Sequence, residues 1–297
     1  MAIKGLSIPA FADYHYDGNT VKYINGFVCG SAIEYGAEIE TSDDNPLYGD
    51  DKIIEHDYGT FSTGTLTINV SDLSQGDSKK LLNLKEIQRM IGNTSVTELV
   101  YDDDAKSASK GFGVIETHQI NDEDRYRAVI LCKVTPKNPS EAATTKGESI
   151  EWQTKEMEAS IERSDEENEN YKHPWKYEAW FKTHAEALEY LKTVLNVLET
   201  LDVTYTKGTT GGKVKLTVKP ASSSGNSYKY KVTNTAPTYK EDLTSWDDWD
   251  GQEELSAQKG NVLYVAEVNQ EKKAVKAGSV EITTDISMMA ASLKKGE

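Results

Sequence analysis

Alternating polar and apolar positions, the pattern of strands with one buried face, recur along most of the chain. The clearest run is residues 65–70, where the alternate residues are leucine, isoleucine and valine. Residues 125–134 have a nearly continuous apolar centre, which is typical of a strand in the middle of a sheet. The turn residues Asp17-Gly18 predict a hairpin over residues 14–23. Further strands are predicted at residues 32–40, 113–117, 213–218, 228–232, 262–268 and 279–283.

Two segments have helical spacing instead. In residues 183–201, apolar side chains recur every three or four positions, and Thr183 and Glu186 fit a capping box whose cap stabilises a helix by about 1 kcal/mol. Packing of this apolar stripe on a sheet is the simpler interpretation, and a cofactor or a partner helix is the alternative. A weaker helix is predicted at residues 78–91, with Ser78 as its cap.

Composition divides the chain near residue 203. Residues 1–202 hold 20 basic and 37 acidic residues, a net charge of −17, whereas residues 203–297 hold 13 and 12, a net charge of +1. Turns rich in glycine, threonine and serine begin at the same place. We therefore predict two domains, 1–202 and 203–297. The second has the strand spacing of a small immunoglobulin-like sandwich, without the cysteine pair of an antibody domain.

Residues 40–59 are polar and rich in turn-forming residues, which predicts a long loop. A loop of this length in a compact domain usually has a function or is disordered.

The net charge of −16 over 297 residues argues against a nucleic-acid-binding protein of the usual basic kind. Residues 1–12 lack the continuous apolar stretch of a secretory signal, and no apolar run reaches the length that spans a bilayer. Cys29 and Cys132 lie in apolar contexts far apart in the sequence. We interpret them as reduced, buried packing residues.

The sequence motifs typical of cofactor-binding, metal-binding and catalytic sites are incomplete in this chain. The stretch Gly111-Phe112-Gly113 begins like a dinucleotide-binding fingerprint, but Glu116 stands where the third glycine is required. The five histidines are scattered without a zinc-binding pair, and no serine lies in a nucleophile elbow. We predict no catalytic, cofactor-binding or metal-binding residue and no enzyme. A hydrolase with two carboxylates hidden among the 49 acidic residues is the alternative.

Three clusters admit two interpretations each. The acidic stretches 102–104 and 247–251 are either solvated loops or calcium sites, although Trp246 and Ala257 break the helix-loop-helix calcium pattern in the second. An aromatic cluster is either a sugar-stacking surface or a half-buried strand, and its alternation favours the strand. Its members are Trp175, Tyr177, Trp180 and Phe181.

Short motifs occur in a characteristic order along the first domain. They are MAIKGLS at residues 1–7, Pro9, Phe11-Ala12, Ala32-Ile33-Glu34, NPLYGDD at residues 45–51, GTLT at residues 64–67 and Trp152-Gln153-Thr154. In this order and spacing, the sequence resembles the major tail protein, or tail tube protein, family of long-tailed bacterial viruses with non-contractile tails. The likeness spans most of residues 1–201, and an appended immunoglobulin-like domain is familiar in such proteins.

The resemblance implies a two-sheet antiparallel β-sandwich or half-barrel with a flanking helix. It also implies a virion structural protein whose copies form hexameric rings, with inner strands closing into one continuous barrel. Stacked rings would form the tail tube that delivers viral DNA, with no cofactor. The protein would be found in the virion tail, and in the host cytoplasm during assembly. Its partners would be other copies, tail proteins at the tube ends, DNA passing without specific binding, and a host surface weakly contacted by the second domain.

Within this interpretation, stacking is assigned to residues 40–59 and 1–12. Leu6, Phe11, Leu47 and Tyr48 are the candidate assembly contacts, with local packing as the alternative role. The acidity of the first domain either lines the tube and repels DNA phosphates or keeps the subunit in solution before assembly. The competing function is a secreted or cell-surface protein of two β-domains that binds carbohydrate or envelope components.

Overall fold

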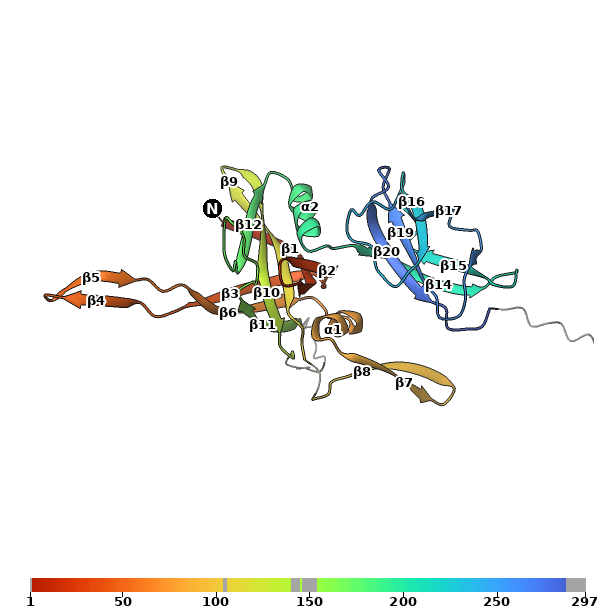
Figure 1. The fold of residues 1–297 in the computed structure, drawn as a ribbon, viewed down its shortest axis with the longest axis horizontal. Helices are drawn as coiled ribbons and strands as arrows, with labels where there is room; N and C mark the ends of the chain where they lie inside the picture. The colour runs from red at the N-terminus through yellow and green to blue at the C-terminus, as the bar shows by residue number, and fades with distance from the viewer. Residues whose placement is uncertain (1, 104–105, 140–144, 146–153, 287–297) are drawn as a thin grey trace, which may run out of the picture. The chain divides into compact units, whose positions relative to one another are not determined.

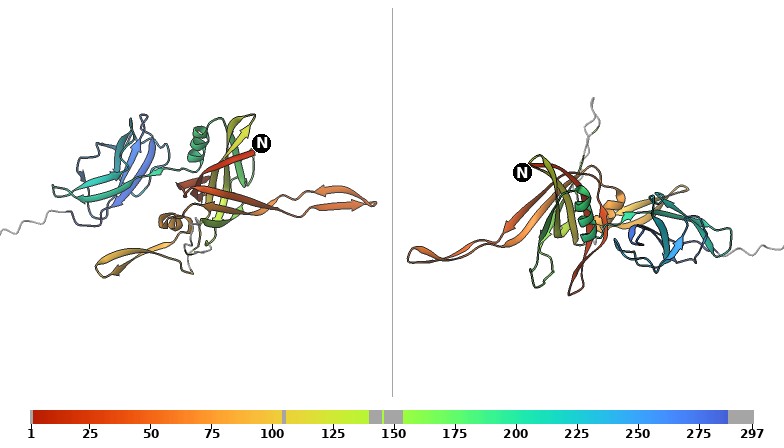
Figure 2. Two further views of the ribbon diagram at one scale, coloured as in Figure 1. Left: turned by 180° about the vertical axis from the view of Figure 1, so that it is seen from behind. Right: turned by 90° about the horizontal axis from the view of Figure 1, so that it is seen from above.

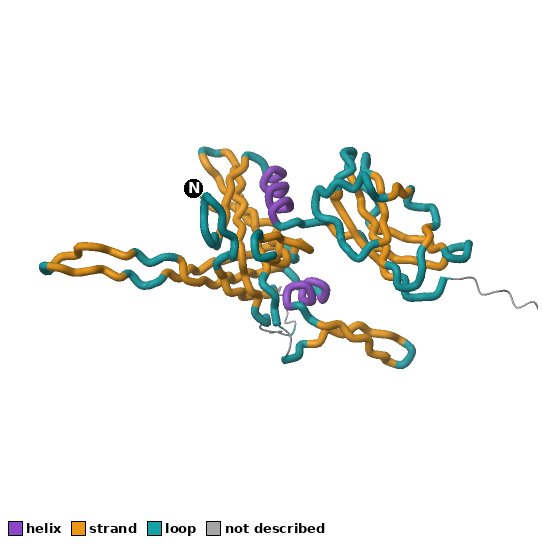
Figure 3. Tube along the Cα trace, viewed as in Figure 1, coloured by secondary structure: helices purple, strands orange, loops and turns teal. Residues whose placement is uncertain are grey.

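The computed structural model describes residues 2–103, 106–139, 145 and 154–286. It is mainly β, with twenty strands and two helices among the described residues (Figures 1 and 3). The chain divides into two compact units, Met1–Val197 and Leu198–Glu297, each with its own core. The predicted mainly β fold of antiparallel sheets is confirmed.

The first unit is built on an eight-stranded antiparallel sheet in the order β2-β1-β9-β10-β11-β6-β3, with β12 also paired to β10. The central strand β10 is long, and it pairs with β12 through Tyr126–Leu131 and with β11 through Lys133–Pro136. The sheet therefore divides at β10. The strands are β1 (Ala2–Tyr16), β2 (Val21–Val28), β3 (Ala32–Thr41), β6 (Phe61–Val70), β9 (Lys110–Ile120), β10 (Glu123–Pro136), β11 (Lys155–Glu162) and β12 (Lys176–Phe181).

The two parts of this sheet fold over each other and enclose the main core. Leu66, Ile68 and Val70 of β6 are buried, as their alternation predicts, and they belong to the same cluster as Phe11 and Phe112 from β1 and β9. Tyr35 of β3 reaches across to the β9 layer, where its ring centroid lies 6.3 Å from that of Phe112. Since β3 and β9 are not neighbours in the sheet order, this contact closes the sheet into a sandwich or half-barrel.

Helix α2 (His184–Val194) covers the outer face of β9 and β10 (Figure 1). The predicted capping box is confirmed, because the Thr183 hydroxyl accepts from the Glu186 N–H and the Glu186 carboxylate accepts from the Thr183 N–H. A Cβ on Gly113 would lie 2.8 Å from Leu195 Cδ1, so glycine here lets the chain after the helix pack closely on β9. The stripe of α2 is therefore core.

The helix ends earlier than predicted. Asn196 has a left-handed backbone, which turns the chain away after Val194. The helical spacing in the sequence extends to Leu198 and Leu201, but these two residues lie beyond the helix and pack in the cores of the second unit.

The second predicted helix, over residues 78–91, is wrong in its bounds. Helix α1 spans Gln75–Leu82, and Ser74 rather than Ser78 caps it by accepting from the Asp77 N–H. Asn83 then adopts a left-handed conformation that ends the helix. The rest of the predicted helix is β7 (Lys85–Ile91), which pairs with β8 (Thr94–Val100) in a hairpin.

Residues 40–59 are not a structureless loop. They extend β3 and β6 into a hairpin of β4 (Asn45–Gly49) and β5 (Lys52–Asp57), the long orange projection in Figures 1 and 2. Residues 2–12 are likewise not a free arm, because β1 pairs with β9 almost from its start, at Ala2.

The second unit is a β-sandwich of immunoglobulin-like character. Its larger sheet has the order β13-β20-β19-β16-β17 and its smaller sheet the order β14-β15-β18, with a shared core between them. The strands are β13 (Glu199–Thr200), β14 (Asp202–Lys207), β15 (Lys213–Lys219), β16 (Ser227–Val232), β17 (Asp247–Trp249), β18 (Leu255–Ser256), β19 (Val262–Val268) and β20 (Ala274–Glu281).

The division between the units falls before Leu198, earlier than the composition change near residue 203. Leu201 donates its backbone N–H to the carbonyl of Ala277 at 2.9 Å, and β13 adds to the edge of β20. Residues 198–202 therefore belong structurally to the second unit.

Candidate assembly surfaces

The β4–β5 hairpin is the most exposed apolar feature of the first unit. Leu47 and Tyr48, two of the predicted contacts, lie on β4 with 61% and 65% of their surfaces exposed. Asp50 and Asp51 at the tip both have positive φ angles, which is the geometry of a two-residue type I′ turn. The exposed apolar side chains of this hairpin and its base are Leu47, Tyr48, Ile53, Ile54 and Tyr58.

Contacts at the base fix the hairpin to the sheet. Ser42 donates its N–H to the carbonyl of Thr60 at 2.8 Å, and Gly59 donates its N–H to the Asp44 carboxylate at 2.8 Å. The His56 and Tyr58 rings lie with centroids 4.1 Å apart. The hairpin is thus an ordered projection of the sheet.

The other two predicted contacts lie elsewhere. Phe11 is only 1% exposed, and its ring packs in the core with its centroid 5.0 Å from that of Phe112. It is therefore a core residue, and its assignment as an assembly contact is wrong. Leu6 is half-buried on β1 against the same core. The structure brings Leu47 and Tyr48 together and separates them from Leu6 and Phe11.

Sequence reasoning missed a second exposed hairpin, β7–β8. Cross-strand polar contacts hold it together, including Arg89 Nε to a Glu98 carboxylate oxygen at 2.6 Å and Gln88 to Thr97 at 2.8 Å. The signal in the sequence was the turn pair Gly92-Asn93, because residues 94–100 do not alternate between polar and apolar. Its exposed apolar side chains, with those next to it, are Ile87, Met90, Ile91, Val96 and Tyr101.

The outward face of β3, β6 and β11 carries carboxylates. Directly paired residues point to the same side of an antiparallel sheet. Thr65 pairs with Glu38 of β3, and Asn69 pairs with both Glu34 of β3 and Glu156 of β11. We call this surface, opposite the buried leucine and isoleucine of β6, the acidic face. Its exposed glutamates are Glu34, Glu38, Glu40, Glu156 and Glu158, of which Glu158 pairs with Lys137 at 3.1 Å.

A buried polar cluster joins the two layers. Glu116 on β9 is 2% exposed, and its carboxylate accepts from the Tyr35 hydroxyl and from Arg127 at 3.1 Å and contacts His118 Nε2 at 2.7 Å. Burial alone would raise the pKa of Glu116, but the hydrogen bonds from Tyr35 and His118 and the charge of Arg127 lower it overall. Burial raises the pKa of Tyr35, so its phenol stays a donor. The cluster therefore links β3 to β9 and β10 through buried hydrogen bonds.

Other clusters do not converge into a site. In the described part of the chain, no group of three histidine, cysteine or acidic residues is placed to hold a metal ion. Asp248 instead pairs with Lys229 at 2.9 Å, and Asp104 of the other acidic stretch lies outside the described residues, as do Trp152 and Gln153. Both cysteines are free and buried, as predicted, and burial raises the pKa of each thiol to about 12.

The predicted aromatic strand is confirmed as β12. Tyr177 and Phe181 pack on the α2 side of the sheet, and Trp175 stacks on Phe61 with a centroid distance of 5.0 Å. The cluster therefore does not form one aromatic platform.

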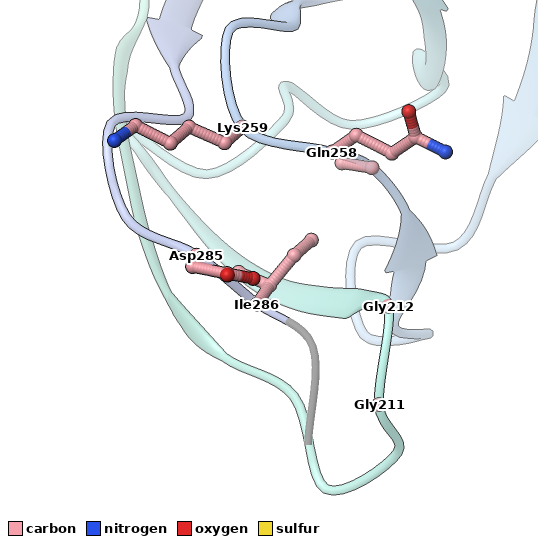
Figure 4. A pocket seen from close by; sticks show the side chains of 7 residues that line it. Gly211, Gly212, Gln258, Lys259, Asp285 and Ile286 are labelled. Carbon is pink, nitrogen blue, oxygen red and sulfur yellow. The ribbon is translucent and has the colours of Figure 1, made fainter. Parts of the chain in front are cut away.

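A pocket of about 440 Å³ lies in the second unit beside Ile286 (Figure 4). The side chains of Lys259 and Gln258 point in opposite directions, so its polar groups do not meet at one point. Its lining residues are Gly211, Gly212, Ala257, Gln258, Lys259, Asp285 and Ile286.

No helix in the described residues is both long and apolar enough to cross a membrane.

Comparisons with known proteins add little. No family model matches the sequence, and no curated protein matches it. Among solved structures, the crystal structure of domains 7, 8 and 9 of the S-layer protein SbsC matches with 15% identity and a TM-score of 0.28. The match covers 78% of this chain and 72% of that chain. A likeness at this score supports no inference about function.

Proposed function

We propose that this protein is a virion structural subunit of the tail tube type. In this proposal, copies of the first unit join into hexameric rings, and the rings stack into the tube that delivers viral DNA. The subunit would act in the virion tail after assembly in the host cytoplasm, with other tail proteins at the tube ends.

The observation that carries the proposal is the uneven distribution of exposed apolar side chains. Of the nineteen large apolar side chains exposed among the described residues, eighteen belong to the first unit and one, Val232, to the second. Single exposed apolar side chains are normal, but clustered ones mark interaction sites, and ten of these eighteen lie on or beside the β4–β5 and β7–β8 hairpins. The two units differ here although both are β-sandwiches. This uneven exposure supports the proposal that the first unit is the part that assembles.

The sheet edges give a second reason. β2 and β3 are the two end strands of the eight-stranded sheet. An end strand presents unpaired backbone groups, and closing a ring of copies removes such edges. Ring closure through strand pairing would use both end strands.

The acidic face suits the lining of a DNA passage. Carboxylates repel phosphates and give no counterion-release attraction, so DNA would slide past them. Changing Glu34, Glu38 and Glu156 to lysine should leave tubes able to form but slow DNA delivery. Unchanged delivery from intact variant tubes would favour the alternative, that the acidity serves solubility.

Electron microscopy of the purified protein, before and after concentration, tests the proposal. We expect rings and hollow tubes of constant width. The double variant Leu47→Asp/Tyr48→Asp should reduce assembly, whereas Val232→Asp, at the exposed apolar position of the second unit, should not. A wild-type protein that stays monomeric at every concentration, also with tail-end proteins added as initiators, would contradict self-assembly.

A further inference from the structure

The β4–β5 and β7–β8 hairpins expose apolar side chains that the rest of the first unit does not cover. Figures 1 and 2 show the β4–β5 hairpin and the β7–β8 hairpin projecting from the first unit in different directions. Each hairpin forms a two-stranded sheet of its own. Each also exposes large apolar side chains, among them Tyr48 and Ile54 on one and Met90 and Ile91 on the other. Because the hairpins point apart, neither covers the other within one copy.

The charges of the two hairpins favour contact between different copies. Residues 42–59 contain six acidic residues and one lysine, a net charge of −5. Residues 75–101, which include α1 and the β7–β8 hairpin, contain four basic and three acidic residues, a net charge of +1. The β7–β8 hairpin itself, residues 85–100, holds two basic and two acidic residues and is neutral, and three aspartates follow it at residues 102–104. Two copies of the acidic hairpin would repel each other, whereas the β7–β8 hairpin has no net negative charge and exposes Lys85 and Arg89 to an acidic partner.

The basic side chains are accessible to a second partner. Lys85 and Arg89 each face one carboxylate, at 2.7 and 2.6 Å, and both are largely exposed. Ion pairs at exposed positions contribute little and are screened by salt. An approaching row of carboxylates can therefore share these cations without disrupting a buried network.

We propose that the acidic β4–β5 hairpin of one copy docks along the β7–β8 hairpin of a second copy. If the hairpins pair edge to edge, Leu47 and Ile54 would lie beside Ile87 and Ile91 on one side of the joined strands, and Tyr48 beside Met90 on the other, because successive residues of a strand point to opposite sides. The contact joins two different surfaces, so each copy has one free hairpin of each kind left for the next copy, and repetition yields a ring or a stack. This inference rests on the proposed self-assembly and names the two surfaces that meet in it.

Disulfide trapping tests the pairing. Protein carrying Tyr48→Cys is mixed with protein carrying Met90→Cys, so that a bond between the two positions can form only between copies. The native Cys29 and Cys132 are buried, and a thiol with a pKa of about 12 reacts slowly, so the background is low. The matched control mixes Tyr48→Cys with Val232→Cys, another exposed apolar position.

We expect the Tyr48–Met90 cross-link, identified by mass spectrometry of linked peptides, to exceed the control by about tenfold, as held proximity raises effective concentration. Lys85→Glu/Arg89→Glu should also weaken assembly at low salt, whereas Lys231→Glu in the second unit should not. Unchanged melting temperatures would show that the variants stay folded.

The outcomes separate this inference from the proposed function. If the wild-type protein forms rings or tubes but the Tyr48–Met90 yield equals the control, the pairing of the hairpins is wrong and self-assembly stands. If the wild-type protein forms no oligomer under any of the conditions above, both are overturned.

Discussion

At the scale of single residues, the Glu116 cluster is the most consequential feature. Its carboxylate is shared by Tyr35 from one layer and by His118 and Arg127 from the other. A glutamine at this position would remove the charge that Arg127 faces and place an amide N–H₂ among donors. We expect Glu116→Gln to lower the free energy of unfolding by about 2–4 kcal/mol. Tyr35→Phe removes one hydrogen bond and should cost about 1 kcal/mol.

Urea denaturation of the two variants beside the wild type checks this prediction. Equal effects of Glu116→Gln and Tyr35→Phe would mean that the carboxylate charge contributes nothing beyond its bond to the phenol.

The same carboxylate predicts how stability depends on pH. The pKa of Glu116 is lowered in the folded protein, so the unfolded chain binds the proton more readily. Its contribution is present above the unfolded pKa of about 4.3 and is lost as pH falls through the folded value. We expect the wild type to lose more stability than Glu116→Gln when pH is lowered from about 5 towards 3. Parallel acid limbs in thermal melts of the two proteins would contradict a depressed pKa.

At the scale of elements, sequence patterns correctly predicted the features that depend on interactions between residues close together in the sequence. Strand β6 and the capping box of α2 are as predicted, because alternation and a cap motif act within a few residues. The prediction for Phe11 was wrong because the sequence around an apolar residue does not distinguish a side chain in the core from one that contacts a partner. The α1 region failed for a similar reason: an apolar cluster fits a helix, and only the left-handed Asn83 shows where the helix stops. In the Glu116 cluster, Arg127 faces Glu116 across the β9–β10 hairpin, but Tyr35 comes from a strand distant in sequence, so no spacing reveals its part.

The capping box of α2 gives a prediction about a single element. Thr183→Ala removes the acceptor for the Glu186 N–H and should lower stability by about 1 kcal/mol. Glu186→Gln keeps an oxygen that can accept from the Thr183 N–H, so it should cost less. Denaturant midpoints measure both. A Glu186→Gln variant as unstable as Thr183→Ala would point to the charge of the glutamate rather than to the reciprocal hydrogen bonds.

The β4–β5 hairpin should be separable from the fold that bears it. Its apolar side chains are exposed, and the pairing of Ser42 with Thr60 closes the sheet below it. Replacing residues 43–59 by an Asn-Gly turn should leave the melting temperature of the first unit nearly unchanged and abolish assembly. Calorimetry and electron microscopy measure the two effects. A large loss of stability would show that the hairpin belongs to the core instead of to an interface.

At the scale of the whole molecule, charge and apolar exposure divide along the same boundary. With the division placed before Leu198, the first unit carries a net charge of −15 and the second −1. The first unit also holds nearly all of the exposed large apolar side chains. Within the proposed function, this contrast predicts that the second unit is dispensable for tube formation, because among the described residues it exposes a single large apolar side chain.

Two pairs of fragments test this division and its exact position. Leu198 and Leu201 pack in the second unit, and β13 pairs with β20. A fragment 198–297 should therefore have a higher free energy of unfolding than 203–297, by about 2–4 kcal/mol for the buried Leu201 and the half-buried Leu198. Fragment 1–197 should assemble like the full chain, whereas 1–202 gains no stability from five extra residues that bring two uncovered leucines. Equal free energies of unfolding for 198–297 and 203–297 would instead place the domain boundary at the composition change near residue 203. Failure of a folded 1–197 to assemble would instead make the second unit part of the tube wall.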